Sequence, residues 1–146
     1  MSFETIHSDI CNVLEKDAFL LKNNVQVFQE DKGDVIATVK GAIMKLGICA
    51  VVAVPSAKAV SENSRNIVAM AEVMVQVVES PALNRGRANS CSAGIAARHI
   101  AAVLNLEKTK EGNCIVFRDL SGAVLEGGNV AYNVWFKVQT TLSKNA

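Results

Sequence analysis

The segment 66-NIVAMAEVMVQVVE-79 decides the fold more than any other stretch of this sequence. Valine occupies every second position from 73 to 77, and the alternate positions hold Glu72, Met74 and Gln76. A repeat of two residues places these two sets on opposite faces of a β-strand. We therefore predict a strand over residues 66–79, which is long for a small domain. A helix is the alternative for its first half, because the Ala-Met-Ala run at 69–71 is compatible with both structures.

The residues before this strand predict two helices and two further strands. A first helix, with Ser2 as a candidate cap, has apolar residues at helical spacing: Phe3, Ile6, Ile10, Val13 and Leu14. The short run VQVFQ at 25–29 is β-prone. A second helix is expected between Asp34, a suitable N-cap, and Gly47, a suitable C-terminal stop. Its predicted core face is Ile36, Val39, Ile43 and Leu46.

The run 48-ICAVVAV-54 follows the second helix and shows no clean alternation. This pattern predicts a strand that is covered on both faces. We expect Pro55 to end that strand and residues 55–65 to form a polar loop.

The residues after position 79 predict a helix and two closing strands. Ser90 or Ser92 can cap an alanine-rich helix that ends near Asn105; its expected core residues are Ile95, Ile100, Val103 and Leu104. Strands are expected at 114–120 and 131–142. In the last strand, one face holds Tyr132, Val134, Phe136 and Val138, and the other holds Asn133, Trp135, Lys137 and Gln139.

The order of the predicted elements is α-β-α-β-β-α-β-β. Consecutive strands with short links favour a mixed, mostly antiparallel sheet with helices packed on it, which is the α+β class. The length of 146 residues suits one domain, and no internal repeat or flexible linker divides the sequence. We expect a single domain over residues 1–146.

Composition and charge exclude several classes of protein. The 15 Lys and Arg residues against 14 Asp and Glu give a net charge of +1, and half of the residues are hydrophobic. The hydrophobic content argues against disorder, and the scattered basic residues argue against DNA binding by a monomer. No signal peptide is expected, and the longest apolar run, GICAVVAVP, is about half the length of a membrane-spanning helix. We therefore expect a soluble protein, made in the cytoplasm, with no membrane partner.

The sequence offers no convincing set of catalytic or metal-binding residues. Its cysteines are widely spaced, without a CxxC pair, which predicts buried thiols rather than a zinc site; they are Cys11, Cys49, Cys91 and Cys114. Cys91 lies between two serines and is expected to be the more exposed. No phosphate-binding or dinucleotide-binding fingerprint is present. We expect no catalysis, no metal and no cofactor.

The segment 79-ESPALNRGRANSCSAGIAARHI-100 contains the one candidate binding loop. Arginines and a glycine just before a helix are a common way to hold a phosphate or a carboxylate. The candidate contact or anion-binding loop consists of Asn84, Arg85, Arg87 and Ser90. The alternative is that the arginines are solvated or pair with acids of a neighbouring subunit. We favour a contact loop.

The predicted sheet has more apolar surface than its own helices can cover. Strand 66–79 carries apolar side chains on both faces, and Trp135 shares a face with polar residues. Because one face of an antiparallel sheet is commonly polar in a monomer, large apolar groups there indicate coverage by another subunit. The candidate subunit-interface residues are Glu72, Met74, Gln76, Trp135 and Lys137. Head-to-tail contacts between identical copies can close into a ring.

The same patterns carry a family resemblance. The segments are the N-terminal helix, the helix ending in KLG, and the runs ICAVVAVP, VQVVESPALNRG, SAGIAARHIAAVLN and NVAYNVWFKVQTTL. Their order from Phe3 to Leu142 resembles the small tail-terminator and tail-completion (neck) proteins of tailed bacteriophages. It is a likeness of pattern, since that family has no diagnostic motif, and it transfers no individual site residue.

The resemblance implies a structural protein of the virion that catalyses no reaction. It implies a ring, commonly of six subunits, which caps the tail tube and joins it to head-side proteins. The implied partners are further copies of the chain, the tail tube protein, a head-completion or connector protein, and DNA touched non-specifically in the lumen. The implied location is the neck or tail of the virion, after assembly in the host cytoplasm.

Two other hypotheses remain open from the sequence. One is a different small oligomeric virion or adaptor protein with a related fold. The other is a small oligomeric anion-binding domain or enzyme that uses Arg85, Arg87 and His99.

Overall fold

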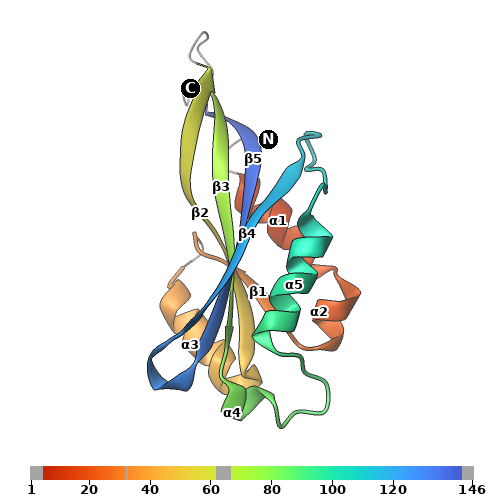
Figure 1. Ribbon diagram of the computed structural model, residues 1–146, viewed down its shortest axis with the longest axis vertical. Coiled ribbons are helices and arrows are strands. Elements are labelled where there is room, and N and C mark those ends of the chain that lie inside the picture. Colours follow the sequence, from red (N-terminus) through yellow and green to blue (C-terminus); the bar gives the residue numbers. More distant parts are fainter. Residues whose placement is uncertain (1–4, 32, 62–66, 143–146) are drawn as a thin grey trace.

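A five-stranded sheet runs along the length of the molecule, with helices on both of its faces (Figure 1). The computed structural model describes residues 5–31, 33–61 and 67–142. In chain order the elements are α1 (Ile6–Glu15), α2 (Ala18–Lys22), β1 (Gln26–Gln29), α3 (Val35–Leu46), β2 (Ile48–Ser61), β3 (Ile67–Glu79), α4 (Pro81–Asn84), α5 (Ala93–Leu104), β4 (Ile115–Val124), the 3-10 turn η2 (Glu126–Gly128) and β5 (Val130–Leu142). Apart from the short helices α2 and α4 and the turn η2, this is the predicted order, and the α+β class is confirmed.

The strands lie in the order β1-β2-β3-β5-β4. β1 pairs with β2 in parallel, and the other three pairs are antiparallel, so the sheet is mixed and mostly antiparallel as predicted. β3 is the central strand and pairs along its whole length with β5.

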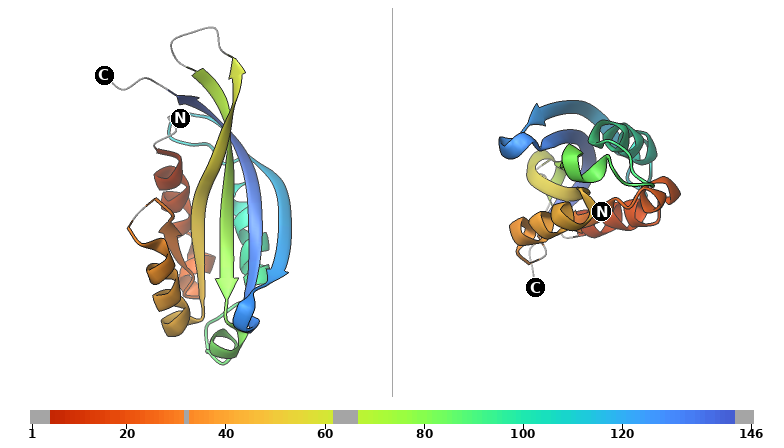
Figure 2. Two further views of the ribbon diagram at one scale, coloured as in Figure 1. Left: turned by 90° about the vertical axis from the view of Figure 1, so that its left-hand side faces the viewer. Right: turned by 90° about the horizontal axis from the view of Figure 1, so that it is seen from below.

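The alternation predicted for β3 is confirmed. Val73, Val75 and Val77 are fully buried on one face of the sheet, which we call the inner face. α1 packs on this face against β1 and β2, and α5 packs on it against β3, β4 and β5 (Figure 2). Phe136 of β5 is fully buried in the same core, with its ring edge against Phe117 of β4.

The opposite face, which we call the outer face, is covered at one end by α3. A small cluster forms there from Ala42, Ile43, Cys49, Val78 and Ala131. The predicted ends of α3 are confirmed: the Asp34 side chain accepts a hydrogen bond from the Ala37 N–H at 3.2 Å, and Gly47 ends the helix with a left-handed φ of 79°. The prediction of Ile36 as a core residue is wrong, since its side chain is 67% exposed. Ile36 instead lines a groove that α3 forms with Val51, Val78 and Leu125.

The prediction that Pro55 ends the second strand is wrong. β2 continues to Ser61 and pairs with β3 on both sides of the proline, with a register shift between Ala53 and Ser56. Proline lacks an N–H to donate to a strand ladder, and a bulge is where a sheet tolerates it. The long β3 supplies the partner that keeps β2 extended. β2 is also less covered than predicted, because Val51 and Ala53 are only half-buried on the outer face.

The alanine-rich helix is confirmed as α5, with Ser92 rather than Ser90 as its cap. Its buried stripe consists of Ala93, Ala96, Ala97, Ile100 and Leu104. Ile95 is 49% exposed, which contradicts its predicted core position. The buried residues of α5 recur every three or four positions from Ala93, and Ile95 falls outside that series, so it lies on another side of the helix.

The cysteine predictions are confirmed in part. Cys11 and Cys49 are buried and Cys91 is half-buried, but Cys114 is exposed at the start of β4. Ser2 and Phe3, which the sequence suggested for the first helix, lie outside the described residues.

Candidate functional site

The strand register brings the five predicted interface residues together on the outer face. Across β3 and β5, Glu72 is paired with Lys137, Met74 with Trp135 and Gln76 with Asn133. We call these six residues the outer patch; all are half-buried. α1 and α5 pack on the inner face, and α3 covers the outer face around Cys49, Val78 and Ala131, so the outer patch lies on the part of the outer face that α3 leaves uncovered.

The outer patch has an apolar centre between two polar rows. The central row runs from Ala53 through Met74 and Trp135 to Asp119 across four strands. On one side of it, the Gln76 amide donates to Asn133 Oδ1 at 3.1 Å. On the other side, the Ser56 hydroxyl donates to the Glu72 carboxylate at 3.4 Å. An apolar centre with Trp and Met inside a polar rim is typical of protein–protein interfaces.

A small hollow lies beside Trp135 on the outer face. It measures about 220 Å³ and is lined by Glu72, Arg118, Asp119, Trp135, Phe136 and Lys137. Small-molecule sites usually enclose roughly 300–1,000 Å³. The hollow beside Trp135 lies below that range.

A wider apolar groove separates α3 from the end of the β4–β5 hairpin. Its volume is about 540 Å³, with Val51 and Val78 on its floor and Leu125 on its far wall. Met44 of α3 is 77% exposed at this groove. Groove and outer patch share Gln76, so they form one continuous outer surface.

The candidate loop is organised around a residue that the sequence analysis did not single out, Glu79. This side chain is 1% exposed at the end of β3 on the inner face. Its two oxygens accept hydrogen bonds from Asn84 Nδ2 at 2.7 Å and from the Ala93 N–H at 3.0 Å. The Glu79 carboxylate therefore lies at the N-terminus of α5, where an external anion was expected. The unpaired N–H groups and the dipole at a helix N-terminus favour a negative charge at this position.

Asn84 and Arg85 converge on Glu79, whereas Arg87 and Ser90 do not. Asn84 is buried, and its amide also donates to the Cys91 carbonyl at 2.8 Å, which ties both ends of the loop together. The Nε atom of Arg85 lies 3.6 Å from the Glu79 carboxylate, with most of the guanidinium exposed.

The other two loop residues make local contacts. Arg87 Nε donates to the Leu83 carbonyl and the Ser90 hydroxyl donates to the Arg87 carbonyl, both at 3.4 Å. Whether the loop binds an anion or a protein stays a prediction. A signal for Glu79 was present in the sequence, since it is the one acid on the otherwise apolar inner-face positions of β3.

The histidines and buried cysteines make structural contacts. His99 Nε2 lies 2.6 Å from Asp17, the N-cap of α2, and its ring stacks on Phe19. His7 Nε2 lies 3.1 Å from Glu30, at the end of β1. Burial raises the pKa of the Cys11 thiol to about 12, which keeps it protonated and unreactive at neutral pH.

Within the described part of the chain, no three histidine, cysteine or acidic side chains lie close enough together to hold a metal ion. No helix of residues 5–31, 33–61 and 67–142 has both the length and the hydropathy for crossing a bilayer.

Comparison with known proteins gives a likeness in structure alone. No protein-family model and no curated protein sequence matches this chain. Six chains of solved structures match. One of them belongs to the virion of a native gene transfer agent particle; the two chains are 11% identical, with a TM-score of 0.63, over 94% of this chain and 95% of the other. At this identity the match shows that the two chains share a fold from end to end.

Proposed function

We propose that this protein is a structural component of a phage-like virion, and that it acts as a tail-terminator or neck ring. The observation that carries the proposal is the shared fold with a virion chain over nearly the full length of both chains. The order of sequence patterns, which resembles phage tail-terminator and neck proteins, supports the same role independently.

In the proposed ring, the outer patch of one copy packs against the next copy. Trp135 and Met74 form the apolar centre of this contact, and Glu72, Gln76 and Lys137 lie in its polar rows. Tryptophan is among the residues that most often dominate the binding energy of an interface. Burial of this row removes from water the apolar surface that the chain's own helices leave uncovered.

Two free edges of the sheet, that of β2 beyond β1 and that of β4, are poorly suited to pairing with another copy, which favours association through faces. β1 pairs only with residues 49–52 of β2, so the remainder of β2 is an edge. Pro55, the exposed Lys58 and two register shifts interrupt that edge. On β4, the Phe117 N–H is already bonded to Asn105 Oδ1. Proline, lysine and bulges are the features by which proteins protect edge strands.

The candidate loop suits a second contact in the proposed assembly, along the axis of the ring. α4 and the segment that follows it lie at one end of the long axis of the molecule (Figure 1). In this proposal, Arg85 and Arg87, which follow α4, contact a protein stacked above or below the ring. The partners in this proposal are the tail tube protein and a head-completion or connector protein, with DNA in the lumen.

The mass of the protein under native conditions tests the ring. We expect the wild-type protein to form a closed oligomer, with six copies as the expected number. Trp135→Ala should weaken each contact by about 2 kcal/mol, which is roughly a 30-fold loss of affinity. Ile95→Ala is the matched control, since Ile95 is an exposed apolar residue away from the outer patch. Equal assembly of both variants would contradict the proposed role of the patch.

A double variant separates the contact loop from an anion site. With Arg85→Ala and Arg87→Ala, the proposal predicts weaker joining to tail tubes and an intact ring. An anion-binding domain would instead lose binding of inorganic phosphate, measured by calorimetry, without any effect on joining.

A further inference from the structure

The edge strand β1 differs from the other free edges of the sheet. It is the terminal strand in the order β1-β2-β3-β5-β4, so one of its sides has no strand beside it within the described residues. Its sequence, QVFQ, contains no proline, glycine or charged residue, and its register with β2 has no shift. Proteins usually protect edge strands with proline, lysine or bulges. Because β1 has none of these features, its free edge is open to pairing with a further strand.

The register with β2 shows which main-chain groups of β1 point to the free edge. The Glu30 N–H donates to the Val52 carbonyl at 3.0 Å, directly after the pair that Gln29 forms with Val52. In a parallel ladder, alternate residues of a strand bond to the neighbouring strand, and the residues between them direct their N–H and C=O groups to the other side. Phe28 therefore bonds to β2 as Glu30 does, whereas Val27 and Gln29 face the free edge. Within the described residues, the main-chain N–H groups of Val27 and Gln29 have no acceptor.

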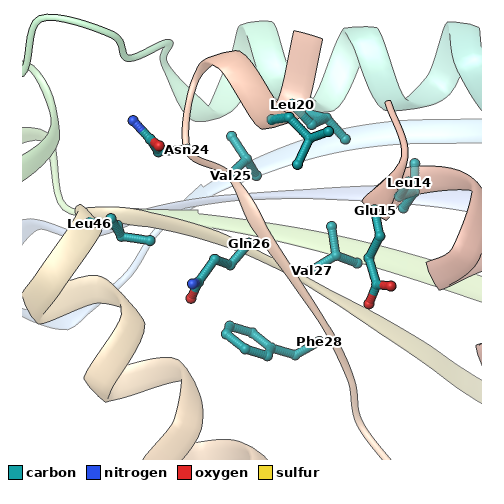
Figure 3. A pocket seen from close by; sticks show the side chains of 10 residues that line it. Leu14, Glu15, Leu20, Asn24, Val25, Gln26, Val27, Phe28 and Leu46 are labelled. Carbon is teal, nitrogen blue, oxygen red and sulfur yellow. The ribbon is translucent and has the colours of Figure 1, made fainter. Parts of the chain in front are cut away.

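A groove of about 550 Å³ follows this free edge (Figure 3). The consecutive residues 24–28 all line it. Val27 packs in the inner core and Phe28 packs against the cluster under α3, so their side chains lie on opposite faces of the sheet. A hollow that both faces reach lies along the edge of the strand and not on one face. Residues of α1 and α2 border the groove on its inner side, and Leu46 of α3 borders it on its outer side.

The accessible part of the lining flanks the edge on both sides. Leu21 is 62% exposed, and Val27, Phe28 and Leu46 are half-buried. The side chains of an added strand alternate between the two faces, so apolar side chains would contact Leu21 and Val27 on one side and Phe28 and Leu46 on the other. Glu15 is exposed at the border and is the one charged residue among those that line the groove. A lysine or arginine at one end of the added strand complements this carboxylate.

We propose that the free edge of β1 binds an extended segment of a different protein, which joins the five-stranded sheet as one further strand. The main chain of this segment bonds to Val27 and Gln29, its apolar side chains alternate between the two walls of the groove, and a basic side chain lies near Glu15. Addition of a strand to an exposed sheet edge is a recurrent mode of peptide recognition, in which main-chain hydrogen bonds provide affinity. The inference goes beyond the proposed ring contact, which uses the outer face.

A second copy of this chain is the less suitable occupant. The free edge of β2 is interrupted by Pro55, Lys58 and two register shifts, and on β4 the Phe117 N–H is already bonded. Pairing of β1 with β1 remains for two identical copies, and this contact is two-fold, so it stops at a pair. A regular, uncharged edge strand that further copies cannot extend fits a partner with a different sequence.

Amide hydrogen exchange, resolved to single residues, tests the inference with the synthetic peptide acetyl-KVIVIK-amide as the probe. In the full-length protein alone, the Val27 and Gln29 amides should exchange at least about tenfold faster than those of Phe28 and Glu30, which bond to β2. Saturating peptide should slow exchange at Val27 and Gln29 by about tenfold and leave Phe28 and Glu30 within about twofold.

Two alternately N-methylated forms of the peptide are the matched controls. The N–H groups of a strand point to its two sides in turn, so one form should lose the effect on Val27 and Gln29 and the other should keep it. Glu15→Lys should weaken binding of this basic peptide about threefold, as expected for an exposed ion pair. Glu107→Lys changes an exposed acid away from the groove and should leave binding unchanged.

Three outcomes would overturn the inference. Peptide binding that leaves exchange at Val27 and Gln29 unchanged would show an apolar contact without strand addition. The same conclusion follows if no binding occurs even when a cysteine-containing form of the peptide is tethered to Leu21→Cys, made in a Cys91→Ser, Cys114→Ser background to remove the accessible thiols. Slow exchange at Val27 and Gln29 in the protein alone would show that copies of this chain cover the edge. Each of these results leaves the proposed ring contact on the outer face intact, because native mass and the Trp135 variant test that contact separately.

Discussion

Replacement of Glu79 by glutamine tests the buried network that fixes the loop after β3. The carboxylate is 1% exposed and accepts hydrogen bonds from Asn84 Nδ2 at 2.7 Å and from the Ala93 N–H at 3.0 Å. Glutamine has nearly the same shape, but one of its two terminal groups is a donor. In the native geometry that donor would face another donor, so one hydrogen bond is lost and one buried polar group has no partner.

The expected loss of stability follows from these two effects. A hydrogen bond to a charged group contributes about 1.5–3 kcal/mol, and an unpaired buried polar group costs about 1–3 kcal/mol. Because both effects concern the same bond, they overlap, and we expect the free energy of unfolding to fall by about 2–4 kcal/mol. The Arg85 side chain is largely exposed at 3.6 Å from Glu79, so solvent screens its contribution.

Urea unfolding followed by circular dichroism, at one fixed protein concentration, measures this loss. Glu107→Gln is the control, because Glu107 is exposed and its replacement should change stability by less than about 0.5 kcal/mol. A double-mutant cycle with Asn84→Ala should give a coupling energy of about 1 kcal/mol or more. A loss below about 0.5 kcal/mol for Glu79→Gln, or simple additivity with Asn84→Ala, would refute the reasoning.

Three further outcomes follow from the packing. Gly47→Ala should destabilise the fold by more than about 2 kcal/mol in urea unfolding, because its Cβ would lie 2.6 Å from the backbone nitrogen of Asn84 and its φ is positive; a loss under about 1 kcal/mol would contradict this close approach. Asp34→Ala should lower the free energy of unfolding by about 1 kcal/mol through loss of the α3 cap, and Asp34→Asn should restore most of it. In the folded protein, Cys114 should react with a thiol reagent within minutes, whereas Cys11, with a pKa of about 12, should react only on unfolding; fast labelling of Cys11 would show that α1 detaches readily.

The parts of the fold that a local pattern encodes were predictable from the sequence. The period of two in β3 and β5 gave both faces of each strand correctly, since alternate positions in a pleated strand point in opposite directions. Asp34 and Gly47 marked the ends of α3 because capping and the left-handed stop are properties of a few adjacent residues. For the same reason, the placement of Glu72, Met74 and Gln76 on one face of β3, and of Trp135 and Lys137 on one face of β5, could be predicted; their role in an interface stays a prediction.

The errors lie where distant segments decide the structure. Pro55 is a local stop signal, but the long β3 keeps β2 extended past it through a bulge. The apolar pattern of α5 pointed to Ile95, but close packing against the sheet selected the alanine stripe instead.

The sequence marked Glu79 as the one acid among the apolar inner-face positions of β3, but it did not identify the partners that satisfy its buried carboxylate. Its partners, Asn84 in α4 and Ala93 at the start of α5, come near it only when the loop after β3 folds back toward the end of that strand. The pairing of Met74 with Trp135 also depended on a strand order, β3 next to β5, that no short segment specifies.

Electron microscopy of the purified wild-type protein tests the central claim most directly, because it displays the assembly itself. The account predicts closed rings of several copies, with six as the expected number, in which the outer patch is covered by the next subunit. Particles that remain single copies at every protein concentration, with Trp135 open to solvent, would contradict it.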